Sequence, residues 1–216
     1  MTARTAFFDL DGTLIDSKPG ITGALRYALA EMGETVPCAD DLDWVIGPPM
    51  IESLRKLVGE ARAAAAQKVY RARYAEVGLA GNRVYDGMAD VLQRLQAEGW
   101  ALYVATSKLR AFARQIIGHL GFDRFFREVY GAEADGSLMH KTELLAHVLR
   151  ETRVDPARAV MIGDRRHDVI GARANGLPTI GALWGYGGTR ELEEAGAAVL
   201  ARAPADVLPA LATLVG

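Results

Sequence analysis

The sequence is poor in cysteine and in long apolar runs. Cys38 is the only cysteine among 216 residues, so the chain cannot form a disulfide within itself. It also contains no run of about 18 apolar residues, the length that a membrane-spanning helix needs. The first residues lack the apolar stretch of a secretory signal. We therefore expect a cytoplasmic protein with no membrane partner.

Net charge is also small, because 25 lysines and arginines face 27 aspartates and glutamates, a formal charge of −2. Proteins that bind nucleic acid polymers carry a clear positive excess, so we expect no such partner. Hydrophobic residues, in contrast, make up 50% of the chain. The length suits one buried core plus a modest insertion. The sequence predicts a globular protein that is a monomer or a homodimer.

Short apolar runs alternate with amphipathic helical stretches over most of the chain. Runs that are apolar on both faces are typical of strands covered by helices on both sides. The alternation therefore predicts an α/β fold with a Rossmann-like parallel sheet and helices on both of its faces. The expected strands are residues 5–8, 101–105, 128–131, 159–162 and 179–183, and the expected helices include 88–97, 142–151 and 204–214.

One region breaks this alternation. From about Ser17 to Arg83 the pattern is helical, without a convincing strand, and the expected helices at 21–32, 50–58 and 60–77 are each followed by glycine. This pattern predicts an all-helical cap inserted after the first strand. We expect the cap to cover residues 15–83 and the catalytic core to be formed by residues 1–14 and 84–216, with hinge-like connections near 16–19 and 81–83.

The segment Phe7–Leu14 carries the strongest chemical signal. An apolar strand leads directly into Asp9 and Asp11, and Gly12 permits a sharp turn after them. Ligands of open parallel sheets bind at the carboxyl ends of the strands. Two carboxylates this close repel each other unless a cation or a proton lies between them. Solvated acids in an Asp-Gly turn are the ordinary alternative, and the full eight-residue string disfavours it.

Three further segments with polar side chains follow in order. Thr106 and Ser107 end an apolar strand, where a hydroxyl and an amide are available to donate hydrogen bonds. Lys141 lies just before an expected helix. Asp164 and Asp168 follow a buried strand in the pattern G-D-x-x-x-D, so both can face one site. Oxygen ligands of this kind suit Mg²⁺.

These segments together resemble the four motifs of the haloacid dehalogenase-like hydrolase superfamily, whose first motif reads D-x-D-G-T/V-L. The helical insertion resembles the cap of one branch of that superfamily. The string Trp184–Gly188 resembles the phosphoglycolate phosphatase-like and bacterial 5′-nucleotidase-like members. The chain departs from the pattern at Thr142, where many relatives have proline after the lysine.

The resemblance implies a magnesium-dependent phosphatase that acts on a small phosphorylated metabolite, such as phosphoglycolate or a nucleoside monophosphate. Asp9 would be the nucleophile that forms an aspartyl-phosphate. Asp11 would protonate the leaving oxygen and then activate water. The implied phosphate-binding residues are Thr106, Ser107 and Lys141, and the implied ligands of Mg²⁺ are Asp9, Asp11 through its main-chain carbonyl, Asp164, and Asp168, directly or through water.

Other functions stay open from the sequence. A phosphomutase of the same cap class and a pyrophosphatase would use the same motifs. A non-catalytic receiver module has a similar phosphate site but lacks a helical insertion. Asp11 favours phosphate esters, because the dehalogenases lack an acid there and relatives that cleave carbon–phosphorus bonds usually carry alanine. The substrate is also open: six basic residues against one acid between Arg55 and Arg73 fit either a second anionic group or a solvated helix face.

Overall fold

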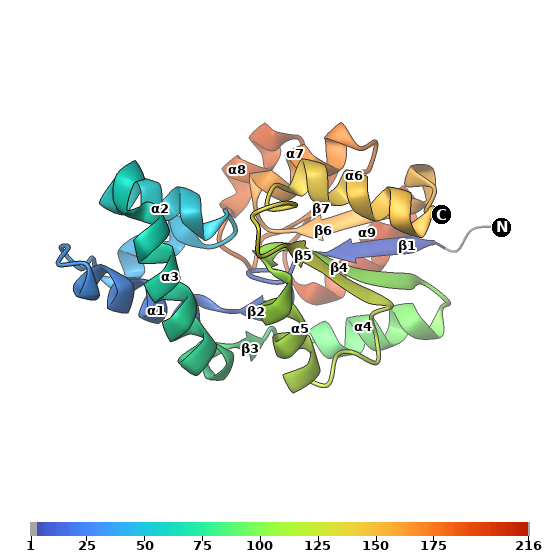
Figure 1. Ribbon diagram of the computed structural model, residues 1–216. Helices are drawn as coiled ribbons and strands as arrows, with labels where there is room; N and C mark the ends of the chain where they lie inside the picture. The colour runs from blue at the N-terminus through green and yellow to red at the C-terminus, as the bar shows by residue number, and fades with distance from the viewer. Residues whose placement is uncertain (1–3, 216) are drawn as a thin grey trace.

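The protein is described by a computed structural model over residues 4–215. Within that range, six parallel strands form a sheet in the order β5-β4-β1-β6-β7-β8 (Figure 1). This sheet confirms the predicted α/β fold. The strands are β1 Thr5–Phe8, β4 Ala101–Leu109, β5 Glu128–Ala132, β6 Ala159–Gly163, β7 Thr179–Ala182 and β8 Val199–Ala201.

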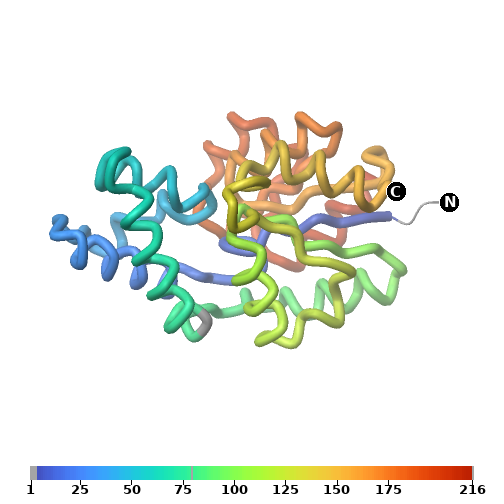
Figure 2. The backbone as a smooth tube through the Cα atoms, viewed as in Figure 1, coloured from blue at the N-terminus to red at the C-terminus, as the bar shows by residue number. Residues whose placement is uncertain are grey.

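Helices cover both faces of the sheet because successive side chains of each strand point to opposite sides. Phe8 packs among residues of α4, α5 and α9, whereas Phe7 packs among residues of α6 and α7. The backbone trace shows β1 threaded between β4 and β6, which come much later in the chain (Figure 2). The helices are α4 Met88–Ala97, α5 Arg110–His119, α6 Lys141–Thr152, α7 Arg166–Ala174, α8 Gly188–Ala195 and α9 Val207–Leu214, with short 3₁₀ helices at Pro156–Arg158 and Pro204–Asp206.

The segment between β1 and α4 forms a group of helices beside the sheet, on the left in Figure 1. We call its members the cap helices: α1 Lys18–Glu31, η1 Ala39–Val45, α2 Met50–Val58, α3 Glu60–Val77 and η2 Leu79–Gly81. They bury a hydrophobic cluster of their own, which includes Leu25, Leu42 and Leu54. The domain boundaries at 14/15 and 83/84 stay a prediction. Across residues 4–215, no helix is long and apolar enough to cross a membrane.

The structure differs from the sequence prediction at several ends of elements. Helix α1 begins at Lys18, three residues earlier than expected, because Pro19 is well tolerated in a first helical turn. Strand β2 Ile15–Asp16 pairs antiparallel with β3 Arg83–Val84. The sequence analysis expected no strand between Ser17 and Arg83, and this is wrong at Arg83, where β3 begins. Strand β8 was not predicted. Helix α6 includes Lys141 as its first residue.

Candidate active site

The predicted site residues gather at one edge of the sheet because their strands are neighbours. Asp9 follows β1, Thr106 lies near the end of β4, and Asp164 follows β6. Strand β1 pairs in parallel with both β4 and β6, and the pairing continues past its end, where the Asp9 amide donates to the Ile162 carbonyl at 2.9 Å. The carboxyl ends of three strands therefore deliver their side chains to one place.

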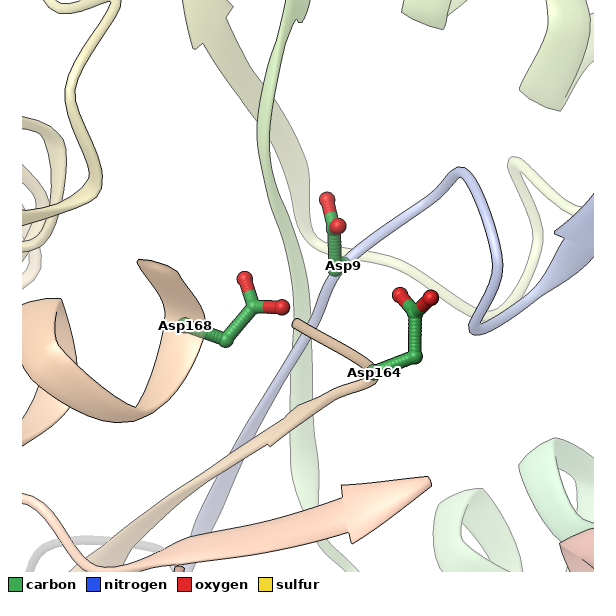
Figure 3. Close-up of side chains that lie close together, drawn as sticks. All are labelled: Asp9, Asp164 and Asp168. Atoms are coloured by element: carbon green, nitrogen blue, oxygen red, sulfur yellow. The ribbon is translucent and has the colours of Figure 1, made fainter. Parts of the chain in front are cut away.

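Three carboxylates and one lysine form a buried cluster there. Asp9, Asp164 and Asp168 are each at most 2% exposed, and one oxygen of each lies within 4.8 Å of the others. They come from the loop after β1, the loop after β6 and the start of α7, and their carboxyl groups surround a common space (Figure 3). The Lys141 ammonium lies 2.9 Å from Asp9 Oδ1 and 2.5 Å from Asp168 Oδ1, and it donates to the Ala105 carbonyl at 2.7 Å.

The charge of this cluster is not balanced by the protein. Burial is the largest influence on Asp9 and raises its pKa to about 6, against the opposing effect of the Lys141 ammonium and with smaller contributions from the Asp168 and Asp11 carboxylates. Burial, followed by the nearby Asp168 and Asp9 carboxylates, holds the pKa of Asp164 well above its ordinary range. Three buried carboxyl groups thus share one ammonium, and hard oxygen donors of this kind prefer a cation such as Mg²⁺. The donor set therefore fits a magnesium ion.

Asp164 is held in place by the segment after β7. Its Oδ2 accepts a hydrogen bond from the Tyr186 amide at 2.8 Å, and its Oδ1 accepts one from the Thr13 hydroxyl at 3.2 Å. The Trp184 indole donates to the Thr13 carbonyl at 3.0 Å. The string Trp184–Gly188 thus fixes both the loop after β1 and one carboxylate of the cluster. The sequence signalled this string without indicating its contacts.

Gly12 lets the loop after β1 approach Asp164. Its φ is +83°, a left-handed conformation that side chains rarely adopt, and a Cβ there would overlap the Asp164 carboxyl group. Gly87 has the same φ of +83° but open space around the position of a Cβ. The two glycines therefore separate the cost of backbone strain from the cost of close approach.

Gly12→Ala is expected to lower the free energy of unfolding by at least about 2 kcal/mol more than Gly87→Ala does, because both introduce strain but only the first displaces a buried carboxylate. Urea denaturation of both variants and the wild type, without added metal, measures the difference. Equal midpoints for the two variants would show that the loop after β1 can move aside at little cost and does not constrain Asp164.

Asp11 lies apart from the carboxylate cluster and pairs with a residue that the sequence analysis did not select. The Lys108 ammonium lies 2.9 Å from Asp11 Oδ1 and 2.7 Å from Oδ2, and the two side chains are 7% and 8% exposed. Burial opposes the charged form of Lys108, but the Asp11 carboxylate, together with smaller effects of Tyr74 and Tyr70, raises the lysine pKa overall. The only sequence signal was the position of Lys108 two residues after Thr106.

The other two predicted phosphate-binding residues lie on the strand beside Asp9. The buried Thr106 hydroxyl accepts a hydrogen bond from the Lys108 amide at 3.3 Å. Ser107 is half-buried and lines a pocket. The structure thus brings Asp9, Lys141, Asp164 and Asp168 into one cluster, and places Asp11, Thr106 and Ser107 around its margin.

A cavity between the core and the cap helices opens onto this margin. Its volume is about 80 Å³, or about 690 Å³ when the adjoining open solvent is included. Asp11, Ser107 and Lys108 line it from the core, and Tyr70 and Arg71 line it from α3. We call it the cap pocket. Further apolar lining comes from Pro48, Met50, Phe112 and Met139.

Comparisons with known proteins agree with this geometry. The family described as "Haloacid dehalogenase-like hydrolase" matches residues 6–182. A Pseudomonas aeruginosa protein named "5'-nucleotidase" is 45% identical over 86% of this chain and 85% of its own length. A Mycobacterium tuberculosis protein named "Tyrosine-protein kinase PtkA" is also 45% identical, over 85% of this chain but 63% of its own length. The crystal structure of a "predicted phosphatase" from Clostridium acetobutylicum, 34% identical, superposes with a TM-score of 0.95 over 99% of this chain and 100% of that one.

Proposed function

The chain belongs to the haloacid dehalogenase-like hydrolases and is a phosphatase of phosphoric monoesters, and we propose that it acts through an aspartyl-phosphate on Asp9 with the help of Mg²⁺. One observation carries the proposal. Asp9 is a buried carboxylate that touches the Lys141 ammonium, lies within reach of two further carboxylates and is two residues from Asp11, which lines the cap pocket. A nucleophile, a cation site and a proton-transfer group are therefore available to one substrate phosphate.

The proposed reaction has two steps. First, an oxygen of Asp9 forms a bond to phosphorus, and the bond to the leaving oxygen breaks with its electron pair while Asp11 gives that oxygen a proton. Second, a water oxygen attacks the phosphorus of the aspartyl-phosphate, its proton passes to Asp11, and Asp9 leaves as a carboxylate. The products are an alcohol and inorganic phosphate, and Asp11 has regained its proton.

The residues around Asp9 would hold the phosphoryl group and offset its charge. The Lys141 ammonium, 2.9 Å from Asp9 Oδ1, is close enough to stabilise both the nucleophile and an incoming phosphoryl oxygen. Thr106 and Ser107 would donate to the other oxygens from the end of β4. Mg²⁺ supplies further positive charge when bound. Its proposed ligands are Asp9, the main-chain carbonyl of Asp11, Asp164 and Asp168.

The cap pocket supports a nucleoside monophosphate as the first candidate substrate and phosphoglycolate as the second. Much of the lining is apolar or aromatic, including Met50, Tyr70 and Phe112, and such a surface stabilises a planar base better than a two-carbon acid. The relative named "5'-nucleotidase" points in the same direction.

A panel of phosphorylated metabolites tests the proposed function. We expect the protein to release inorganic phosphate from at least one monoester in the presence of Mg²⁺. The same samples should be analysed for an isomerised sugar phosphate, for pyrophosphate cleavage and for phosphotyrosine formed from ATP and a tyrosine peptide. Any of these three products without release of phosphate from a monoester would contradict a phosphatase.

Arg71→Ala is expected to weaken binding of the best natural substrate about tenfold, measured as KM, because a charged hydrogen bond contributes about 1.5–3 kcal/mol. Arg71 is half-buried and lines the cap pocket from α3. The effect on p-nitrophenyl phosphate should be much smaller. Lys68→Ala, an exposed cation on the same helix outside the cap pocket, is the matched control. Equal losses on both substrates would show that Arg71 plays no part in selectivity.

A further inference from the structure

Lys108 lies between an acid of the core and an aromatic ring of the cap helices. Its ammonium contacts both oxygens of Asp11, at 2.7 and 2.9 Å. On the other side it lies 4.8 Å from the centroid of the Tyr74 ring, which belongs to α3. A cation over the face of an aromatic ring is attracted by the negative charge at the centre of that face. One side chain thus joins the two parts of the protein at the cap pocket.

The Tyr74 ring is fixed by packing against two other aromatic rings that line the cap pocket. Tyr74 is 1% exposed. Its ring stacks on Tyr70, one turn earlier on α3, with centroids 5.7 Å apart, and it packs against Phe112 of α5 at 5.2 Å. Since Phe112 belongs to the core, this arrangement exists only while α3 lies against the core. If α3 moved away, Lys108 would lose its aromatic contact and gain water.

The contact with Asp11 controls how that carboxyl group is turned. An ammonium that binds both oxygens restricts rotation of the carboxyl group about its own bond, and the low exposure of both side chains keeps the pair from being screened by solvent. Asp11, Lys108 and Tyr74 all line the cap pocket, where the leaving group of a substrate would lie. A proton can be exchanged with the leaving oxygen or with water only if the carboxyl group faces that space.

We propose that Lys108 is a positioning residue that turns Asp11 toward the cap pocket while α3 is closed against the core. The inference rests on the proposed function, because it assumes that Asp11 exchanges the proton in both steps. Lys108 makes no bond to phosphorus and transfers no proton. It makes the geometry of the acid depend on the position of the cap helices, so that hydrolysis of the aspartyl-phosphate is fast only in the closed protein.

The test compares the two steps with p-nitrophenyl phosphate, whose leaving group needs no proton. We expect Lys108→Met, in the full chain with Mg²⁺, to form the aspartyl-phosphate and release nitrophenolate in a rapid burst approaching one equivalent. The following steady-state rate should fall at least about tenfold, because the second step needs a well-placed base. Lys108→Arg, which keeps the charge, should restore much of that rate. Lys68→Met, an exposed lysine on α3, should match the wild type.

Variants of Tyr74 test the dependence on the cap helices, and they do so even if Lys108→Met does not fold. Tyr74→Leu should slow the steady-state rate and produce a burst, and Tyr74→Phe, which keeps the ring, should slow it less. Intact-mass spectrometry of quenched samples measures the phosphorylated fraction, which should rise in Lys108→Met and Tyr74→Leu.

Three results would overturn the inference alone, given an active wild type. The first is a steady-state rate of Lys108→Met within about twofold of the wild type. The second is an equal slowing of the burst and of the steady state in that variant. The third is a raised KM with unchanged kcat, which would make Lys108 a substrate ligand. A wild-type protein that hydrolyses no phosphate ester would instead overturn the proposed function, and this inference with it.

Discussion

Asp9→Asn is expected to lower kcat at least about a thousandfold. The amide of asparagine cannot form the aspartyl-phosphate, so both proposed steps of the reaction are lost. The fold should survive, since the amide has nearly the shape of the carboxyl group and removes one of three charges that repel each other. Phosphate release and thermal unfolding of the same samples measure the two effects. No phosphorylated protein should be detected by intact-mass spectrometry.

The control for this variant is Asp86→Asn, at a side chain that is 95% exposed and lies outside the cluster. It should match the wild type in both rate and stability, because an exposed ion pair contributes little. A folded Asp9→Asn protein that keeps more than about a tenth of the wild-type activity would contradict the covalent mechanism, since loss of a nucleophile costs orders of magnitude.

Removal of the metal is expected to have the second largest effect. A chelator should abolish phosphate release, and Mg²⁺ should restore it and raise the melting temperature, because an ion that binds only the folded protein stabilises it. The rise in melting temperature measures binding without any substrate. Full activity in chelator, or activation by Zn²⁺ alone, would contradict an oxygen-ligated magnesium site.

The two acids after β6 should differ in their contribution to this site. Lys141 already offsets the charge of Asp168 at 2.5 Å, whereas the bonds to Asp164 come from the uncharged Thr13 hydroxyl and Tyr186 amide. Asp164→Asn should therefore weaken Mg²⁺ binding more than Asp168→Asn does, by about tenfold or more. Titration calorimetry in the absence of substrate measures both affinities. A larger loss in Asp168→Asn would reverse the assignment of the direct ligand.

Regular periodicity made much of the fold predictable. Helices α2, α3 and α4 begin and end where the sequence indicated. Their ends were predictable because a glycine follows α2 and α3 directly and lies two positions after the end of α4. Strand β1 was predicted at its true bounds by its apolar run. Strands β2 and β3 have two residues each and β8 has three, so none is long enough to show alternation.

The candidate site was predictable where its residues lie close together in the sequence, within short motifs. Asp9 and Asp11 share one string, and Asp164 and Asp168 share another, so their roles could be inferred before their geometry was known. Lys108 could not be found in this way, because its partner Asp11 lies 97 positions away. The contact of Tyr186 with Asp164 was not predictable for a different reason: it is made through the backbone amide, which every residue except proline possesses.

The short antiparallel pair of β2 and β3 has a consequence for how such a protein can change over evolutionary time. Ile15 lies opposite Val84 and Asp16 opposite Arg83, so the inserted segment leaves and rejoins the core at adjacent points. An insertion whose ends already meet can be lengthened, shortened or exchanged without moving the strands that carry it. Descendants of one ancestral gene could therefore acquire new substrates by recombination within the insertion, while the inherited chemistry of the sheet passes unchanged from one lineage to the next.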